Sequence, residues 1–162
     1  MFYFDIWWGF LRFSIGQLFT LSWPLRIADQ DILIRGLFSG HVKKSDGSLR
    51  LNAFLLNHHK EKALSVSRLI RPYHEFFASL FLKDAARRNV HFYGVAQLAA
   101  SCVRAVEMDG ARCLKVNAAP TASNPFHANI YLPPDKNKDY YYDIARRLVE
   151  CAGKYIPYES LN

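Results

Sequence analysis

Large apolar side chains fill the first 25 residues of the chain, where phenylalanine, tryptophan, leucine and isoleucine recur with few polar interruptions. Twenty residues separate Asp5 from Arg26, which is enough to cross a bilayer. Arg12 interrupts this run, and an arginine at the centre of a membrane helix costs about 3 kcal/mol. We expect residues 1–28 to form a helix that packs on the rest of the chain or lies at a membrane interface. Membrane contact through 1–25, as a spanning helix, and a misassigned start codon are the alternatives.

The rest of the chain, residues 29–162, shows short strand patterns and two helical stripes, and we expect it to form a single α+β domain. Runs rich in isoleucine, leucine, valine and alanine predict strands at residues 31–38, 63–67, 111–118 and 128–132, and less clearly at 48–56. The order of elements predicts a mostly antiparallel sheet with two or three helices packed on it.

Apolar residues spaced three and four apart predict two helices. Pro72 opens the first and Asn89 ends it, while the second begins near Asp139 and its stripe continues to Ile156. Residues 94–106 fit either a helix or a strand followed by a helical turn that Ser101 caps.

Composition favours an ordinary folded domain, since 51% of the residues are hydrophobic and 22% are charged. The three cysteines, Cys102, Cys113 and Cys151, have no C-x-x-C spacing. We therefore expect reduced, largely buried thiols and a cytoplasmic protein. The histidines lack the spacing of metal ligands, so no metal and no cofactor is expected.

The formal net charge of +7 indicates an anionic partner, such as a nucleotide or nucleic acid. Residues 41–70 are the most basic stretch, and folding could gather a patch from Lys43, Lys44, Arg50, Lys60, Lys62 and Arg68. A basic face exposed only to solvent is the alternative.

The sequence contains no Walker loop, G-x-G-x-x-G, H-E-x-x-H or G-x-S-x-G motif. The clearest local feature is the turn Asn124-Pro125, in which Asn124 can bond its own backbone. This turn places His127 at the start of a strand, where a histidine can act as a general base or bind phosphate. We predict His127 as the catalytic residue and Asn124 as a ligand-binding residue. A purely structural turn is the alternative.

Four further residues are predicted to bind the ligand. Arg35 lies in an otherwise apolar strand and could clamp an anion, unless that strand is an edge strand and the arginine faces water. Ser65 and Ser67 share one face of a strand and could contact one ligand, although such pairs also face solvent. His41 follows the first strand and could approach His127 in the folded sheet.

Several short motifs, Ile34-Arg35, Leu64-Ser65-Val66 and Asn124-Pro125-Phe126-His127-Ala128, together resemble small uncharacterised bacterial domains. That resemblance covers residues 31–150 and implies a bacterial, cytoplasmic origin with no established activity. A strand arginine followed by a strand serine also resembles ADP-ribosyltransferases, which hold NAD with an arginine and use a strand serine and usually a catalytic glutamate. The E-x-E or Q-x-E motif of that glutamate is not found in this sequence.

These observations lead to three hypotheses for function. The first is a basic pocket that binds, and possibly processes, a phosphorylated ligand such as a nucleotide or nucleic acid. The second is a non-catalytic interaction protein, such as a homo-oligomeric accessory protein of a mobile element. The third is a membrane-associated module held by residues 1–25.

Overall fold

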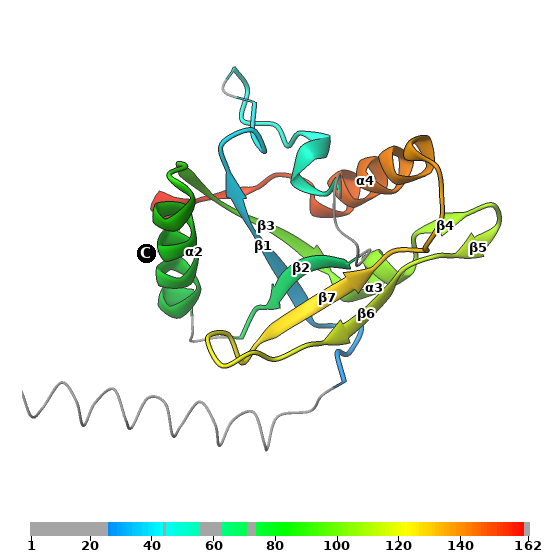
Figure 1. Ribbon diagram of the computed structural model, residues 1–162, viewed down its shortest axis with the longest axis horizontal. Helices are drawn as coiled ribbons and strands as arrows, with labels where there is room; N and C mark the ends of the chain where they lie inside the picture. Colours follow the sequence, from blue (N-terminus) through cyan, green and yellow to red (C-terminus); the bar gives the residue numbers. More distant parts are fainter. Residues whose placement is uncertain (1–25, 44, 56–62, 71–73, 161–162) are drawn as a thin grey trace, which may run out of the picture.

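The computed structural model describes residues 26–43, 45–55, 63–70 and 74–160 (Figure 1). The N-terminal helix expected at residues 1–28 lies almost wholly outside these ranges. No helix of the described ranges is long and apolar enough to cross a membrane.

The described residues form a sheet in the order β6-β7-β2-β1-β3-β8, in which every neighbouring pair is antiparallel. Its strands are β1 (Ile32–Phe38), β2 (Ala63–Arg68), β3 (Phe92–Ala99), β6 (Lys115–Ala118), β7 (His127–Tyr131) and β8 (Ile156–Pro157). A separate two-stranded hairpin consists of β4 (Glu107–Met108) and β5 (Ala111–Arg112). The helices are α2 (His74–Arg88), α3 (Ala100–Arg104), α4 (Lys138–Ala152) and two short 3-10 turns, η1 (Leu51–Ala53) and η2 (Tyr158–Ser160). The predicted α+β class and mostly antiparallel sheet are confirmed.

Each face of the sheet packs against its own helices, because residues alternate between the two faces along a strand. On one face, Leu33 and Leu64 join a core with Ile144 and Leu148 of α4. On the other face, α2 covers β1 and β3, where it forms a second, phenylalanine-rich core. Figure 1 shows α2 and α4 on either side of these two central strands.

Gly36 lets α2 lie close to β1. A Cβ at this position would fall 2.6 Å from the Phe81 ring of α2, closer than packed atoms allow. Phe77 of the same helix packs against Phe126, with ring centroids 5.7 Å apart, so α2 also reaches the turn that leads into β7. The position of α2 is therefore fixed relative to both β1 and β7.

Several sequence predictions need correction at the level of single elements. In the stretch 48–56, expected as a strand, the described residues 48–55 form none: they contribute η1 and one isolated bridge between Val42 and Leu49. The stretch 111–118 divides into β5 and β6. For residues 94–106 the strand-then-helix alternative is correct, but Ala99 occupies the N-cap and no side chain caps the turn, so the predicted Ser101 cap is wrong.

The ends of the two long helices are clear. Asn89, with φ of 52°, directly follows α2 and ends it as predicted. Helix α4 ends at Gly153, with φ of 60°, so Ile156 belongs to β8 and not to the helical stripe. The Pro72 start of α2 lies outside the described residues.

The prediction of three reduced thiols is wrong. Cys102 of α3 and Cys151 of α4 form a disulfide with their Cα atoms 5.9 Å apart, while Cys113 is free. The bond joins two helices that pack on the same face of the sheet. The sequence argument from reduced cysteines to a cytoplasmic location therefore loses its basis.

Candidate functional site

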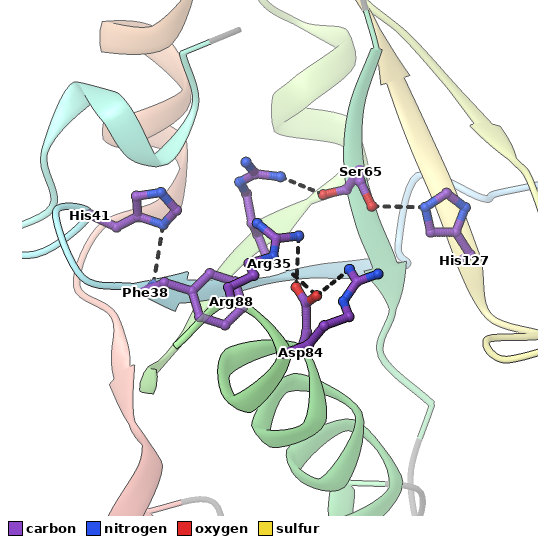
Figure 2. A network of polar contacts seen from close by, with 8 residues as sticks. Arg35, Phe38, His41, Ser65, Asp84, Arg88 and His127 are labelled. Atoms are coloured by element: carbon purple, nitrogen blue, oxygen red, sulfur yellow. Dashed lines mark hydrogen bonds and ion pairs between the residues drawn. The ribbon is translucent and has the colours of Figure 1, made fainter. Parts of the chain in front are cut away.

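A hydrogen-bonded serine and histidine lie on the face of the sheet that carries α2. The Ser65 Oγ and His127 Nε2 atoms are 2.8 Å apart (Figure 2). On the other side of the ring, His127 Nδ1 is 2.8 Å from the carbonyl oxygen of Ala119. Because a carbonyl oxygen only accepts hydrogen bonds, Nδ1 carries the proton. In the neutral imidazole, Nε2 is then the acceptor, and the Ser65 hydroxyl donates to it.

The register of the sheet brings these two residues together. Strands β2 and β7 pair so that Ser67 faces His127 and Ser65 faces Asn129. Directly paired residues point to the same face of a sheet, and diagonal neighbours on that face lie within reach of long side chains. Ser65 is the diagonal neighbour of His127, which explains the contact between residues 62 positions apart.

The turn before His127 is held by two buried polar side chains. Asn124 Nδ2 donates to Ser67 Oγ at 2.8 Å, and the Phe126 amide donates to Asn124 Oδ1 at 3.1 Å. Ser67 is 3% exposed and Asn124 is 6% exposed. The predicted self-capping role of Asn124 is confirmed, and both side chains position the strand that carries His127.

Arg35 lies next to this pair and donates to the backbone of two other elements. Its Nε donates to the Ala53 carbonyl at 2.5 Å, and its Nη1 donates to the Ser65 carbonyl at 2.6 Å. Strands β1 and β2 pair at only two positions, so the guanidinium replaces part of the missing ladder. Since β1 lies between β2 and β3, the edge-strand alternative for Arg35 is wrong.

Positive charge accumulates around Arg35. Burial, and secondarily the neighbouring Arg88 of α2, lower the pKa of Arg35 to about 10, so it remains charged at neutral pH. In the described part of the chain Arg35 has no carboxylate partner, and the nearby Asp84 bonds Arg87 and Arg88. Figure 2 shows the arginines side by side, with Asp84 below them. The guanidinium of Arg35 therefore has no counter-charge of its own among these residues.

His41 lies beside the same arginines. Its Nδ1 accepts a hydrogen bond from the Phe38 amide at 3.2 Å. Burial, followed by the charges of Arg35 and Arg88, lowers the pKa of His41 to about 4, so it is neutral at pH 7. Figure 2 places His41 and His127 on opposite sides of Arg35, so the expected approach of the two histidines does not occur.

The predicted site residues thus fall into three groups. Arg35, Ser65 and His127 are linked in one network, Ser67 and Asn124 support it from within, and His41 lies beyond Arg35. Sequence reasoning missed Arg88 and the Ala119 carbonyl. No local pattern could have identified them, because a basic residue at a helix C-terminus is common and every residue has a carbonyl.

Three of the six residues of the expected basic patch lie within the described ranges. Lys43 and Arg50 are exposed, and Arg68 pairs with Asp31 at 2.9 Å. Lys44, Lys60 and Lys62 lie outside the described ranges. Within those ranges, no group of three or more histidine, cysteine or acidic residues is placed to hold a metal ion.

The chain matches no protein-family model, curated protein or solved structure. A neutral His127, oriented by the Ala119 carbonyl, can take a proton from the Ser65 hydroxyl or from a ligand hydroxyl in its place. An adjacent arginine can neutralise an anionic substrate.

Proposed function

We propose that this protein binds and processes a phosphorylated ligand, a nucleotide or nucleic acid, at the network of Arg35, Ser65, Arg88 and His127. The observation that carries the proposal is the hydrogen bond from the Ser65 hydroxyl to His127 Nε2. The backbone carbonyl of the same serine accepts from the Arg35 guanidinium, which has no carboxylate partner in the described part of the chain. Hydroxyl, base and cation in one network are the groups that phosphate or acyl chemistry requires.

The charge distribution favours an anionic ligand. Asp84 bonds Arg87 and Arg88 and leaves Arg35 without a carboxylate partner among the described residues. Burial first, and then neighbouring positive charge, lowers the pKa of both Arg35 and His41. An anion would offset this repulsion. Planar guanidinium groups bind phosphate in a two-pronged geometry, which a lysine cannot reproduce.

His127 acts in this proposal as a general base. Its Nε2 takes the proton of the Ser65 hydroxyl as the serine oxygen bonds to the phosphorus of the ligand. The bond from phosphorus to the leaving oxygen then breaks, and the protonated His127 returns the proton to that oxygen. The Ala119 carbonyl keeps the imidazole in the required tautomer. Ser65 is exposed, so a ligand can reach its hydroxyl from solvent.

Calorimetric titration of the full chain with adenosine monophosphate and NAD tests the binding step. Arg88→Ala should weaken nucleotide binding about tenfold or more, because a charge-assisted contact is worth about 1.5–3 kcal/mol. Arg87→Ala is the matched control, since Arg87 shares Asp84 but does not perturb Arg35. Equal affinities for the two variants, or no binding by the unmodified chain, would overturn the proposal.

His127→Ala and Ser65→Ala test the processing step. Both variants should lose product formation, followed by mass spectrometry, while Ser101→Ala on α3 retains it. If His127 is catalytic, its variant keeps a melting temperature within a few degrees of the unmodified protein. A purely structural histidine would instead cost about 1–3 kcal/mol of stability through its lost hydrogen bonds, with activity lost only in proportion to unfolding.

A further inference from the structure

Three strands of the sheet expose one polar face next to the Ser65–His127 pair. Tyr131 of β7 lies opposite Ala63 and Lys115, and Asn129 lies opposite Ser65 and Asn117. Directly opposed residues project from the same face, so these side chains form rows across β2, β7 and β6. We call this surface the polar strip and define it by Ala63, Ser65, Lys115, Asn117, His127, Asn129 and Tyr131.

The polar strip lies outside the phenylalanine-rich core beneath α2. That core draws on β1, β3 and the turn residue Phe126, and on none of the strip residues. The opposite face of the same three strands is fully apolar and buried, with Leu64, Val66, Val116, Ala128 and Ile130 at most 4% exposed. The strands are thus anchored from one side, and Tyr131 remains 39% exposed on the other.

The charge of this region complements a phosphate backbone. No residue of the polar strip is acidic. A cavity of about 590 Å³ adjoins the strip at β6, and four basic residues contribute to its lining: Arg26, Arg104, Arg112 and Lys115. Arg104 is paired with Asp29, whereas Arg112 and Lys115 are exposed.

We propose that the polar strip binds single-stranded nucleic acid and delivers it to the Ser65–His127 pair. Tyr131 stacks on a base, the amides of Asn117 and Asn129 bond base edges, and Arg112 and Lys115 neutralise phosphates. This inference rests on the proposed function and specifies its ligand.

The dimensions of the strip suit a short single strand. Two strand spacings separate β2 from β6, roughly 10 Å, which corresponds to about three stacked nucleotides at 3.4 Å each. A single strand exposes its base faces and edges, whereas a duplex hides the faces that Tyr131 would contact. The surface therefore favours a single strand over a duplex.

Fluorescence anisotropy with a labelled single-stranded RNA octamer and the full chain tests this inference. Tyr131→Ala should raise the Kd about tenfold, as loss of one stacked base does. Leu82→Ala, on α2, is the matched control, because Leu82 is a large apolar residue with nearly the same exposure, 40%. Lys115→Ala should reduce the slope of log K against log salt by about 0.7, the value for one phosphate contact on a single strand, while Lys138→Ala on α4 leaves the slope unchanged.

The inference and the proposed function fail in different ways. If mononucleotides bind in an Arg88-dependent manner but RNA affinity is insensitive to Tyr131 and Lys115, only the polar strip inference is overturned. If the matched duplex or a polyglutamate peptide of equal charge binds as tightly as the octamer, that inference is also overturned. If neither mononucleotide nor octamer binds, both proposals are wrong.

Discussion

One face of the sheet is divided into two halves that the chain uses differently. Over β1 and β3, Ile34 and Val95 are 2% exposed and pack beneath Phe77 of α2. Over β2, β7 and β6 the same face carries hydroxyl, amide, imidazole and ammonium groups, and among the described residues none of these side chains belongs to the core beneath α2. Antiparallel sheets tolerate water on one face, so this open half can face solvent.

Under the proposed function, the two halves separate stability from binding within one sheet. The covered half buries large apolar side chains and so contributes to the free energy of folding. The side chains of the open half contribute little, because the apolar side chains of β2, β7 and β6 point to the other face of the sheet and are buried beneath α4. Arg88 joins the two halves, since it ends the covering helix and lies against Arg35. Substitutions should therefore affect stability in the covered half, binding in the open half, and both where the halves meet.

Phe77→Ala should give the largest loss of stability. Phe77 is 2% exposed, and truncating a buried phenylalanine costs about 3–5 kcal/mol because it removes apolar burial and leaves a cavity. Tyr131→Ala in the open half should change the free energy of unfolding by only about 0.5 kcal/mol. Urea denaturation measures both, and equal losses would contradict the division of the face into two halves.

Removing the disulfide should come next in size. The bond closes a loop across 49 residues, and cross-links of this kind contribute about 2–4 kcal/mol, mainly by restricting the unfolded chain. The double variant Cys102→Ala, Cys151→Ala avoids leaving a single new thiol. Because the bond lies on the α4 face, nucleotide affinity below the melting temperature should stay unchanged. A large change in affinity at constant foldedness would show that the open half depends on the opposite core.

The long periodic elements could be predicted from sequence because their pattern is local. Alternation in residues 63–67 predicts β2 with both serines on one face, and the stripe after Asp139 predicts α4. The strand prediction for residues 48–56 was wrong, because a partly alternating pattern also fits a 3-10 turn that packs against a core. Short elements carry too few residues for periodicity to distinguish them.

The site could be predicted residue by residue but not as an arrangement. Arg35, Ser65 and His127 attract attention as polar groups on apolar strands, yet their contacts depend on strand order, which joins residues 30 and 62 positions apart. Ser65 is exposed and Ser67 is buried, although both lie on one face of β2. The difference depends on the turn at Asn124, whose side chain bonds Ser67. The disulfide is equally non-local, since nothing near Cys102 indicates Cys151.

Asn124→Ala should have an intermediate effect that begins in the turn and reaches the site. The substitution leaves the buried Ser67 hydroxyl and the Phe126 amide without this partner, which costs about 1–3 kcal/mol. It should also weaken the proposed catalysis by displacing His127, whereas Asn129→Ala on the open face should leave stability within about 0.5 kcal/mol. Thermal melts and activity measured on the folded fraction separate the two effects. Full activity per folded molecule in Asn124→Ala would remove its positioning role.

A smaller effect than these losses is a dependence on pH at the boundary between the halves. The folded-state pKa of His41 is lowered from 6.5 to about 4, so between these values the unfolded chain binds a proton that the folded chain does not. The stabilisation is fully present above pH 6.5 and is lost as the pH falls towards 4. Allowing for partial exposure, the loss is about 1–2 kcal/mol. Because other groups also titrate in acid, the quantity to measure is the difference in unfolding free energy between the unmodified protein and His41→Asn at pH 7 and pH 4.5.

The same measurement shows whether an anion binds at the boundary. Arg35 and Arg88 contribute to the lowered pKa of His41, so a phosphate group between them should raise that pKa and reduce the loss of stability in acid. Saturating adenosine monophosphate should therefore flatten the pH dependence of the unmodified protein and leave that of His41→Asn unchanged. If the nucleotide stabilises the protein but does not alter this pH dependence, the phosphate binds away from Arg35, Arg88 and His41. The boundary between the two halves is then not an anion site.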